Sequence, residues 1–424
     1  MIAGVLLVLL IGAAILSYLD RLAISTLGPA LKTEFSLDNL HWGYINSAFS
    51  LVYIFTSLLG GWWVDRAGVR KGLLISIAVW GLAAMGHSFA TGFWSLCFWR
   101  MMLALGEGPG MAAMVKGTRR LMPPRGRDFG NGLMNAGWAV GALIAPLVVD
   151  PISRHHGWRA AFLVTGGLCF IWMPLWAVFS WGRSKVLGPQ PIHFIVGSDD
   201  KPPRLNYRSL ALWATVAGIF CTVPPTAFVN TFLPVFFHDA RGLSQQQYAR
   251  LYWQPFLASD IGQVAGGLAV YALLRWGWRF LAARRTIMTL GFLGAVVLIR
   301  VNHEPTVPGT MWCINLSRLF FFVGYAALVS YGLESVGEGQ TALMAGLMNA
   351  TFSACNLVFN PLIGKMADHF HQFNQVIVMI SLMPLVGLAA WMILSHCHSA
   401  VKRDAVGDRI ATAEAHRPAA QGRH

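Results

Sequence analysis

Residues 93–122 read FWSLCFWRMMLALGEGPGMAAMVKGTRRLM, an apolar stretch long enough to cross a bilayer as a helix. It nevertheless carries two charged residues, Arg100 and Glu107. A charge near the centre of a bilayer costs roughly 2.5–3.5 kcal/mol even on the lenient insertion scale. Seven residues make about two helical turns, so both side chains share one face, roughly 10 Å apart along the axis. We expect that face to line a protein cavity rather than contact lipid.

The composition of the whole chain is that of an integral membrane protein. Of its 424 residues, 55% are hydrophobic and only 12% are charged, and the mean hydropathy is +0.54. Soluble domains average about 25% charged residues. About twelve apolar stretches have the length of a bilayer-spanning helix, which predicts an all-α integral membrane fold. These stretches are residues 2–29, 41–64, 72–90, 94–121, 130–151, 158–182, 210–237, 251–274, 285–300, 310–333, 343–365 and 375–396.

The two ends of the chain differ in character. The first apolar stretch starts at Met1 without a basic leader and runs on into further apolar stretches, so we expect a membrane span and not a signal peptide. The abrupt start also suggests that a cytoplasmic head is missing from this sequence. The tail from residue 399 to residue 424 is basic and rich in small residues, and we expect it to be disordered.

The formal net charge of +14 is concentrated in alternate loops. This distribution follows the positive-inside rule of membrane proteins and does not require a nucleic-acid partner. We therefore predict a multi-pass protein of the bacterial inner membrane, with both termini and the central loop in the cytoplasm. The basic clusters that face the cytoplasm in this prediction lie at residues 66–71, 119–127, 183–208, 275–285 and 402–409.

A turn-rich polar connector divides the chain into two blocks of about six helices each. We predict a first six-helix bundle over residues 1–182, a cytoplasmic central loop over 183–209 and a second bundle over 210–398, followed by the tail at 399–424. A faint repeat supports this division, because GGWWVDRAGVRKG at 60–72 and GGLAVYALLRWGWR at 266–279 occupy matching places. Two such halves with a binding site between them resemble the organisation of major facilitator transporters.

The loop after the second stretch carries the pattern GxxxDRxGxRK, which resembles the signature of the major facilitator superfamily. We expect its residues to form a conformational latch in which the carboxylate meets a helix end or an arginine. The alternative is a basic loop that only sets topology. In the second half Tyr271 replaces the acid, so a matching latch there should be weak. The predicted latch residues are Gly61, Asp65, Arg66, Gly68 and Arg70.

Further motifs resemble the anion:cation symporter family, and within it the hexuronate transporters most of all. They cover nearly the whole chain. They include YLDR at 18–21, NSAFSLVY at 46–53, RMMLALGEGPG at 100–110, NAGWAVGALIAPLVV at 135–149, HGWRAAF at 156–162, FVNTFLP at 228–234 and QPFLASDIGQVAGG at 254–267.

This resemblance implies roles for four charged residues of the first half. Arg21 would bind the substrate carboxylate through its planar guanidinium, and Asp20 would carry a coupling proton and compete for that charge. Arg100 would attract the anion, and Glu107 would carry a second proton. Desolvation favours the neutral form of a buried carboxyl, whereas a nearby arginine favours its ionised form. A small change in either effect can then bind or release a proton, as proton coupling requires. Structural ion pairs are the alternative.

Weaker polar candidates complete the predicted site. Tyr53 matches a family position that hydrogen-bonds the substrate, whereas its alternative is an ordinary helix aromatic. Asn135 and Asn349 are predicted to contact substrate as well. Asp260 and Arg318 also look buried, and we favour a structural pair between them over a second contact with the substrate.

The resemblance implies a proton-coupled symporter that imports an organic monocarboxylate, most of all a hexuronate, by alternating access. Its partners would be a small organic anion, protons and the bilayer. No cofactor, metal or nucleic acid is expected, and we expect a monomer. The alternatives are an exporter or antiporter of organic anions or drugs, uptake of aromatic or other carboxylates, and a transport-dead sensor. We expect no enzyme, because no nucleophile or metal cluster is evident.

Overall fold

The computed structural model describes residues 2–123, 127–189, 205, 207, 209–336 and 340–415, and its regular elements there are all helices. The first bundle comprises α1 (Ile2–Thr26), α2 (Gly28–Glu34), α3 (Asn39–Gly86), η1 (His87–Phe89), α4 (Phe93–Leu121), α5 (Arg127–Phe179) and α6 (Ser184–Leu187).

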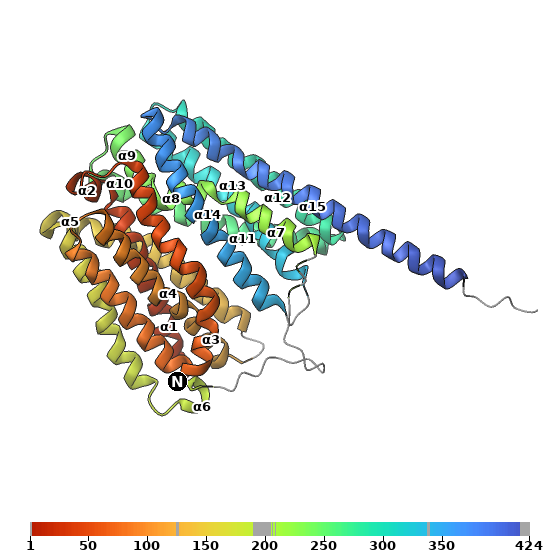
Figure 1. The fold of residues 1–424 in the computed structure, drawn as a ribbon, viewed down its shortest axis with the longest axis horizontal. Coiled ribbons are helices and arrows are strands. Elements are labelled where there is room, and N and C mark those ends of the chain that lie inside the picture. Colours follow the sequence, from red (N-terminus) through yellow and green to blue (C-terminus); the bar gives the residue numbers. More distant parts are fainter. Residues whose placement is uncertain are drawn as a thin grey trace, which may run out of the picture.

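The second bundle lies beside the first (Figure 1). It comprises α7 (Leu210–Thr222), α8 (Pro224–Thr231), α9 (Leu233–Arg241), α10 (Gln245–Tyr252), α11 (Gln254–Arg275), α12 (Phe280–Ala295), η3 (Val296–Asn302), α13 (Val307–Glu334), α14 (Thr341–Phe370) and α15 (Asn374–Ala415). The prediction of an all-α fold built from two helix bundles is confirmed.

Two elements each contain two of the predicted membrane spans. α3 changes direction at Gly68, and α5 does so at Gly157, where φ is 76° and 82° respectively. Glycine adopts such positive φ values without the steric cost that a Cβ brings. By length and apolar character, seven of the described helices could cross a membrane, or eight if the pair α7 and α8, bent by 40°, is one span.

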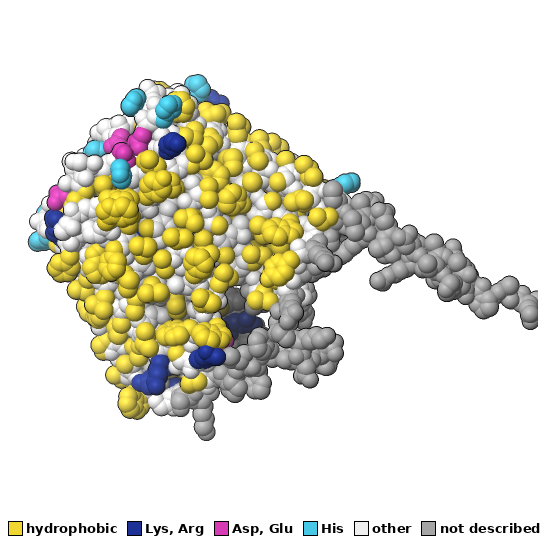
Figure 2. All heavy atoms as spheres, in the orientation of Figure 1, with side chains coloured by type: hydrophobic (Ala, Val, Ile, Leu, Met, Phe, Trp, Pro, Cys, Tyr) yellow, Lys and Arg dark blue, Asp and Glu magenta, His cyan; other side chains and the backbone are white. Residues whose placement is uncertain are grey.

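The molecule has two ends separated by an apolar flank. We call them the Lys32 end, formed by α2, α9 and α10, and the Arg70 end, formed by α6 and the middle of α3. Figure 2 shows hydrophobic side chains over the flank, His and acidic side chains at the Lys32 end, and basic side chains at the Arg70 end. This distribution is that of a multi-pass membrane protein.

α3 and α14 bring the two bundles into close contact near the Lys32 end. A Cβ on Gly43 of α3 would overlap the carbonyl oxygen of Asn360 in α14, and one on Gly364 would overlap the carbonyl oxygen of Asn39. Backbones that approach this closely require glycine. The Ser47 hydroxyl also donates to the Leu357 carbonyl across the same interface, at 3.0 Å.

The tail differs from its prediction over part of its length. We expect disorder from residue 399, but α15 continues as a helix to Ala415 and projects beyond the bundle (Figure 1). This part of the tail contains several alanines, together with lysine and arginine, and all three residue types have high helix propensity. Low hydrophobicity alone therefore does not prevent it from forming a helix. Residues 416–424 lie outside the described residues, as does most of the predicted central loop, residues 190–204, 206 and 208.

Candidate functional site

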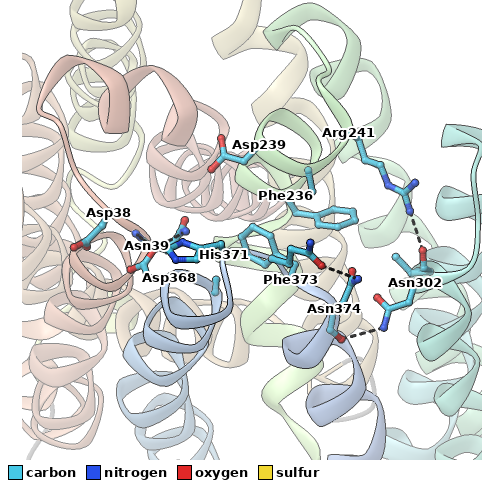
Figure 3. A pocket seen from close by; sticks show the side chains of 14 residues that line it. Asp38, Asn39, Phe236, Asp239, Arg241, Asn302, Asp368, His371, Phe373 and Asn374 are labelled. Atoms are coloured by element: carbon cyan, nitrogen blue, oxygen red, sulfur yellow. Dashed lines mark hydrogen bonds between the residues drawn. The ribbon is translucent and has the colours of Figure 1, made fainter.

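Two cavities lie between the bundles, and their linings differ chemically. The larger, of about 740 Å³, opens at the Lys32 end and is drawn in Figure 3. Asp38, Asp239 and Asp368 contribute carboxylates to its wall. Its one arginine, Arg241, already donates to the carbonyls of Glu304 and Val301, each at 2.8 Å. An acidic wall with an engaged arginine does not suit an organic anion.

The smaller cavity, of about 150 Å³, lies at the centre of the molecule and contains the predicted arginines. Helices α1, α3 and α4 of the first bundle form one side, and α8, α11 and α14 of the second form the other. Its lining residues are Tyr18, Arg21, Leu22, Ser25, Asn46, Phe49, Ser50, Tyr53, Arg100, Met111, Asn230, Thr231, Phe256, Asn349, Phe352, Ser353, Asn356 and Asn360.

Arg21 is held in place by one carboxylate and three aromatic rings. Its Nε donates to Oε2 of Glu107 at 2.8 Å, and Nη2 forms an ion pair with the same oxygen. The guanidinium carbon lies 4.8–4.9 Å from the ring centroids of Tyr18, Phe49 and Tyr53. Cation–π contacts with these rings fix the orientation of the guanidinium. Arg21 therefore presents a preorganised cation to the cavity.

Arg100 faces the same cavity without a carboxylate. Its Nη2 donates to Asn46 Oδ1 at 3.2 Å, and Nη1 is 3.4 Å from the carbonyl oxygen of Arg21. Its guanidinium lies over the Phe49 ring, and its buried Nε has no hydrogen-bond partner. Glu107, the acid predicted to share the face of Arg100, pairs with Arg21 instead. Arg100 therefore forms no ion pair among the described residues.

Asp20 points away from the arginine beside it. It is only 3% exposed, and its Oδ2 accepts a hydrogen bond from the Cys169 thiol at 3.2 Å. Trp80 Nε1 in turn donates to the Cys169 sulfur at 3.1 Å. Consecutive helical residues point about 100° apart, which separates the side chains of Asp20 and Arg21. The expected competition of Asp20 for Arg21 is therefore wrong for this structure, because Glu107 occupies that place.

The three uncharged candidates have different positions. The Tyr53 ring stacks on Phe49 at 5.2 Å, and its hydroxyl lies 3.1 Å from the Met111 sulfur, at the cavity wall. Asn349 lines the opposite side of the same cavity, from α14. Asn135 is exposed and is absent from that wall. It lies near the start of α5, about two helical turns after Arg127.

The predicted latch residues gather at the Arg70 end, around the contact of α3 with α4. Asp65 Oδ1 lies 2.7 Å from Lys116 Nζ and 4.0 Å from an Arg120 nitrogen. Lys116 also donates to the Gly61 carbonyl. Arg66 stacks on Trp62 with 3.8 Å between guanidinium carbon and ring centroid.

The remaining latch residues join α3 to the end of α5 and to the segment after α6. Arg70 Nε donates to the Ser180 hydroxyl at 3.1 Å. A Cβ on Gly68 would come within 2.6 Å of the backbone at Gly188 and Pro189. The described contacts of the motif thus bind parts of the first bundle to one another.

The expected pair of Asp260 and Arg318 is not formed among the described ion pairs. Arg318 is buried and donates to the Thr226 hydroxyl at 2.9 Å, with its guanidinium over Phe322. Its Nε has no hydrogen-bond partner. Their places in α11 and α13 bring the two residues into the same bundle but not within ion-pair distance.

Sequence reasoning missed two groups of residues. A salt bridge of 2.7 Å joins the buried Arg284 side chain, which is 1% exposed, to Glu334, which is 47% exposed. Four asparagines, Asn46, Asn230, Asn356 and Asn360, line the central cavity. The sequence does contain a signal for them, because burying an amide within an apolar span is costly unless the amide forms a hydrogen bond. The motifs NSAFSLVY and FVNTFLP contain two of them.

The comparisons with known proteins agree with this geometry. The family model described as Major Facilitator Superfamily matches residues 10–355. A hexuronate transporter of Escherichia coli strain K12 is 23% identical over 398 residues, which cover 90% of this chain and 91% of that protein. The predicted resemblance to hexuronate transporters is thereby confirmed.

Relatives with other substrates match equally well. A D-galactonate transporter of Escherichia coli O6:H1 is 25% identical, over 92% of this chain and 94% of its own length. A probable sulfoacetate transporter of Cupriavidus necator is 26% identical, over 85% and 86%. Among solved structures, a bacterial homologue of the human lysosomal transporter Spinster, in an inward-facing and unoccupied conformation, superposes with a TM-score of 0.79 at 15% identity. It covers 93% of this chain and 97% of its own, and shows the shared fold.

Proposed function

The chain belongs to the Major Facilitator Superfamily, and on this premise we propose that it is a proton-coupled importer of a small sugar acid, most of all a hexuronate. The family consists of transporters and not of enzymes. Relatives named as hexuronate and D-galactonate transporters support the substrate class. The observation that carries the proposal is the pair of arginines at the central cavity, only one of which has a carboxylate partner among the described residues.

The charge of the cavity favours a monoanion. Arg21 and Arg100 bring two positive charges and Glu107 brings one negative charge, which leaves a net charge of one positive unit. A carboxylate that enters the cavity would neutralise this excess. Arg21 offers two parallel N–H donors for a bidentate contact with a carboxylate, and Arg100 adds its field.

The contact between Arg21 and Glu107 supports the proposed proton coupling. The substrate carboxylate and the Glu107 carboxylate compete for one guanidinium. Each binds it more strongly when ionised than when protonated. A proton on Glu107 would release Arg21 for the substrate, so that proton and anion enter together. Asp20, held by Cys169 on another face of α1, is proposed as a second proton site.

The polar walls of the cavity suit a hydroxylated substrate. Among the described residues, the buried Oδ1 atoms of Asn230 and Asn360 have no hydrogen-bond partner, and Asn349 and Ser353 lie on the same side of the cavity. Amide and hydroxyl groups can each donate and accept, as several sugar hydroxyls require. The second bundle would thus contact the sugar while the first contacts the carboxylate.

The orientation follows from the distribution of charge. The Arg70 end carries the basic clusters of α3 and α4, and the N-terminus lies at this end (Figure 1). By the positive-inside rule this end would face the cytoplasm and the Lys32 end the periplasm of a bacterial inner membrane.

Uptake into proteoliposomes tests the proposal. Labelled hexuronates, aldonates, sulfoacetate and aromatic acids would be offered with and without an imposed inward proton gradient. We expect gradient-dependent accumulation of a sugar acid. Accumulation of sulfoacetate or aromatic acids alone would overturn the substrate class. Efflux of preloaded substrate driven by the inward proton gradient would indicate an exporter that exchanges substrate for protons. No gradient-dependent movement of any acid would contradict proton coupling.

A further inference from the structure

The same helix break occurs once in each bundle at the Lys32 end. α1 ends at Thr26 and α2 continues from Gly28, with Pro29 three residues after Thr26. α8 ends at Thr231 and α9 continues from Leu233, with Pro234 again three residues after the threonine. Thr26 and Thr231 are the last residues of α1 and α8, and the last carbonyls of a helix have no partner within it. Each proline, which has no N–H, also withholds a helical donor from the carbonyl four residues before it.

An aromatic side chain of the opposite bundle reaches each break. Trp42 of α3 donates from Nε1 to the Thr231 carbonyl at 2.9 Å. Tyr248 of α10 donates from its hydroxyl to the Thr26 carbonyl at 3.0 Å. Both side chains are 0% exposed. A buried carbonyl needs a donor from somewhere, and here each bundle supplies the donor for the other.

Trp42 also fills the space between the two breaks. A Cβ on Gly28 would come within 2.9 Å of the Trp42 ring and within 3.3 Å of Val235. The ring therefore packs between α2 of its own bundle and α9 of the other. Ser25 and Thr231, each beside or at a break, line the central cavity. The two aromatic side chains thus stand directly between that cavity and the Lys32 end.

We propose that Trp42 and Tyr248 form a reciprocal lock, in which each bundle donates one buried hydrogen bond to the broken helix of the other and so holds the Lys32 end closed. Opening this end requires both bonds to break. The lock depends on the two-bundle fold and not on the identity of the substrate.

Besides the Ser47 bond to Leu357, further polar contacts between the bundles lie farther out, at the larger cavity. Asp368 accepts from the backbone N–H groups of Asn39 at 3.0 Å and Leu40 at 2.8 Å, and Figure 3 shows it beside Asn39. Lys32 lies 2.9 Å from Asp239, whose side chain is 38% exposed. Solvated ion pairs of this kind contribute little. The buried pair of hydrogen bonds is therefore the stronger candidate for the lock.

The test measures the separation of the bundles directly. Spin labels attached to a clickable non-natural amino acid at positions 156 and 375, both exposed at the Lys32 end, report the distance by double electron–electron resonance in nanodiscs. The native cysteines stay in place. Trp42→Phe and Tyr248→Phe retain the aromatic packing and remove the donor. No substrate or gradient is needed, so the result is independent of the transport proposal.

We expect each variant to raise the ratio of open to closed molecules by about two- to tenfold, the effect of one hydrogen bond. The double variant should multiply the two effects if they are independent. The matched controls remove the same kind of bond within one bundle. Trp172→Phe loses a bond to the Leu9 carbonyl within the first bundle, and Trp253→Phe loses one to the Arg250 carbonyl within the second.

The outcome is decided by the double variant and the controls together. A shift in the double variant with unchanged controls supports the lock. A double variant with the wild-type distance distribution, or controls that shift it equally, overturns the proposal. Thermal unfolding of each variant identifies any that fail to fold, and the remaining single variant then carries the test.

Discussion

Arg21 of α1 and Glu107 of α4 form an ion pair at the central cavity although 86 residues separate them in the chain. The other two buried charged residues of α1 and α4 take different partners, because Asp20 accepts from Cys169 and Arg100 donates to Asn46. Around the central cavity, the described residues thus include one ion pair, one arginine without a carboxylate and one acid bonded to a thiol.

Arg21→Lys tests the need for a planar cation. Lysine keeps the charge but offers no parallel donors to a carboxylate, and it loses the stacking against three rings. We expect the KM for uptake to rise by about tenfold or more, which corresponds to the loss of one charge-assisted hydrogen bond. Arg154→Lys, which lies outside both the cavity lining and the latch, is the control. Equal KM values for Arg21→Lys and the wild type would contradict the assignment.

Glu107→Gln separates substrate binding from proton coupling. The amide cannot take up a proton, but it leaves Arg21 free for a carboxylate. We expect exchange of external for internal substrate to persist, while accumulation driven by the proton gradient is lost. Both are measured in the same proteoliposomes. Glu34→Gln, an exposed acid paired with Arg159, should behave as the wild type. Normal accumulation by Glu107→Gln would exclude Glu107 as the coupling acid.

Gly106→Ala tests the close packing of α3 against α4 beside Glu107. The new Cβ would lie 2.5 Å from the backbone nitrogen of Trp80 and 2.8 Å from the Ser76 carbonyl oxygen, atoms that cannot move alone. Overpacking of this kind costs about 1–3 kcal/mol, and we expect a lower Tm in detergent. Gly167→Ala meets nothing within 4 Å and should leave Tm unchanged or slightly higher. An unchanged Tm for Gly106→Ala would show that the helices can separate there.

Gly68→Ala tests the break within α3. Gly68 and Gly157 both have positive φ values, of 76° and 82°, so alanine strains the backbone at either position. Only at Gly68 would the Cβ also meet backbone, that of Gly188 and Pro189 at 2.6 Å. We expect Gly68→Ala to lower Tm more than Gly157→Ala does. Equal losses would mean that strain alone sets the cost, and that the segment after α6 yields freely.

The sequence predicts the fold well because its strongest signals are local. Apolar length places the spans, and glycine marks the turns within α3 and α5. Arg21 and Arg100 could also be found from sequence, because a charge within an apolar span needs a protein environment. Their partners could not be found, since pairing depends on how α1, α4 and α5 rotate against one another. The same limit explains why Arg318 meets Thr226 and not Asp260.

The lone Arg100 has an electrical consequence. With Glu107 ionised the empty cavity carries one positive unit, and with Glu107 protonated and a monoanion bound it carries one again, because two arginines then face one carboxylate. A cycle that used Glu107 alone would move no net charge across the membrane and would ignore the membrane potential. If the proposed coupling holds, a substrate-induced current recorded from reconstituted membranes would require a further proton, and Asp20, buried in α1, is the acid proposed to carry it.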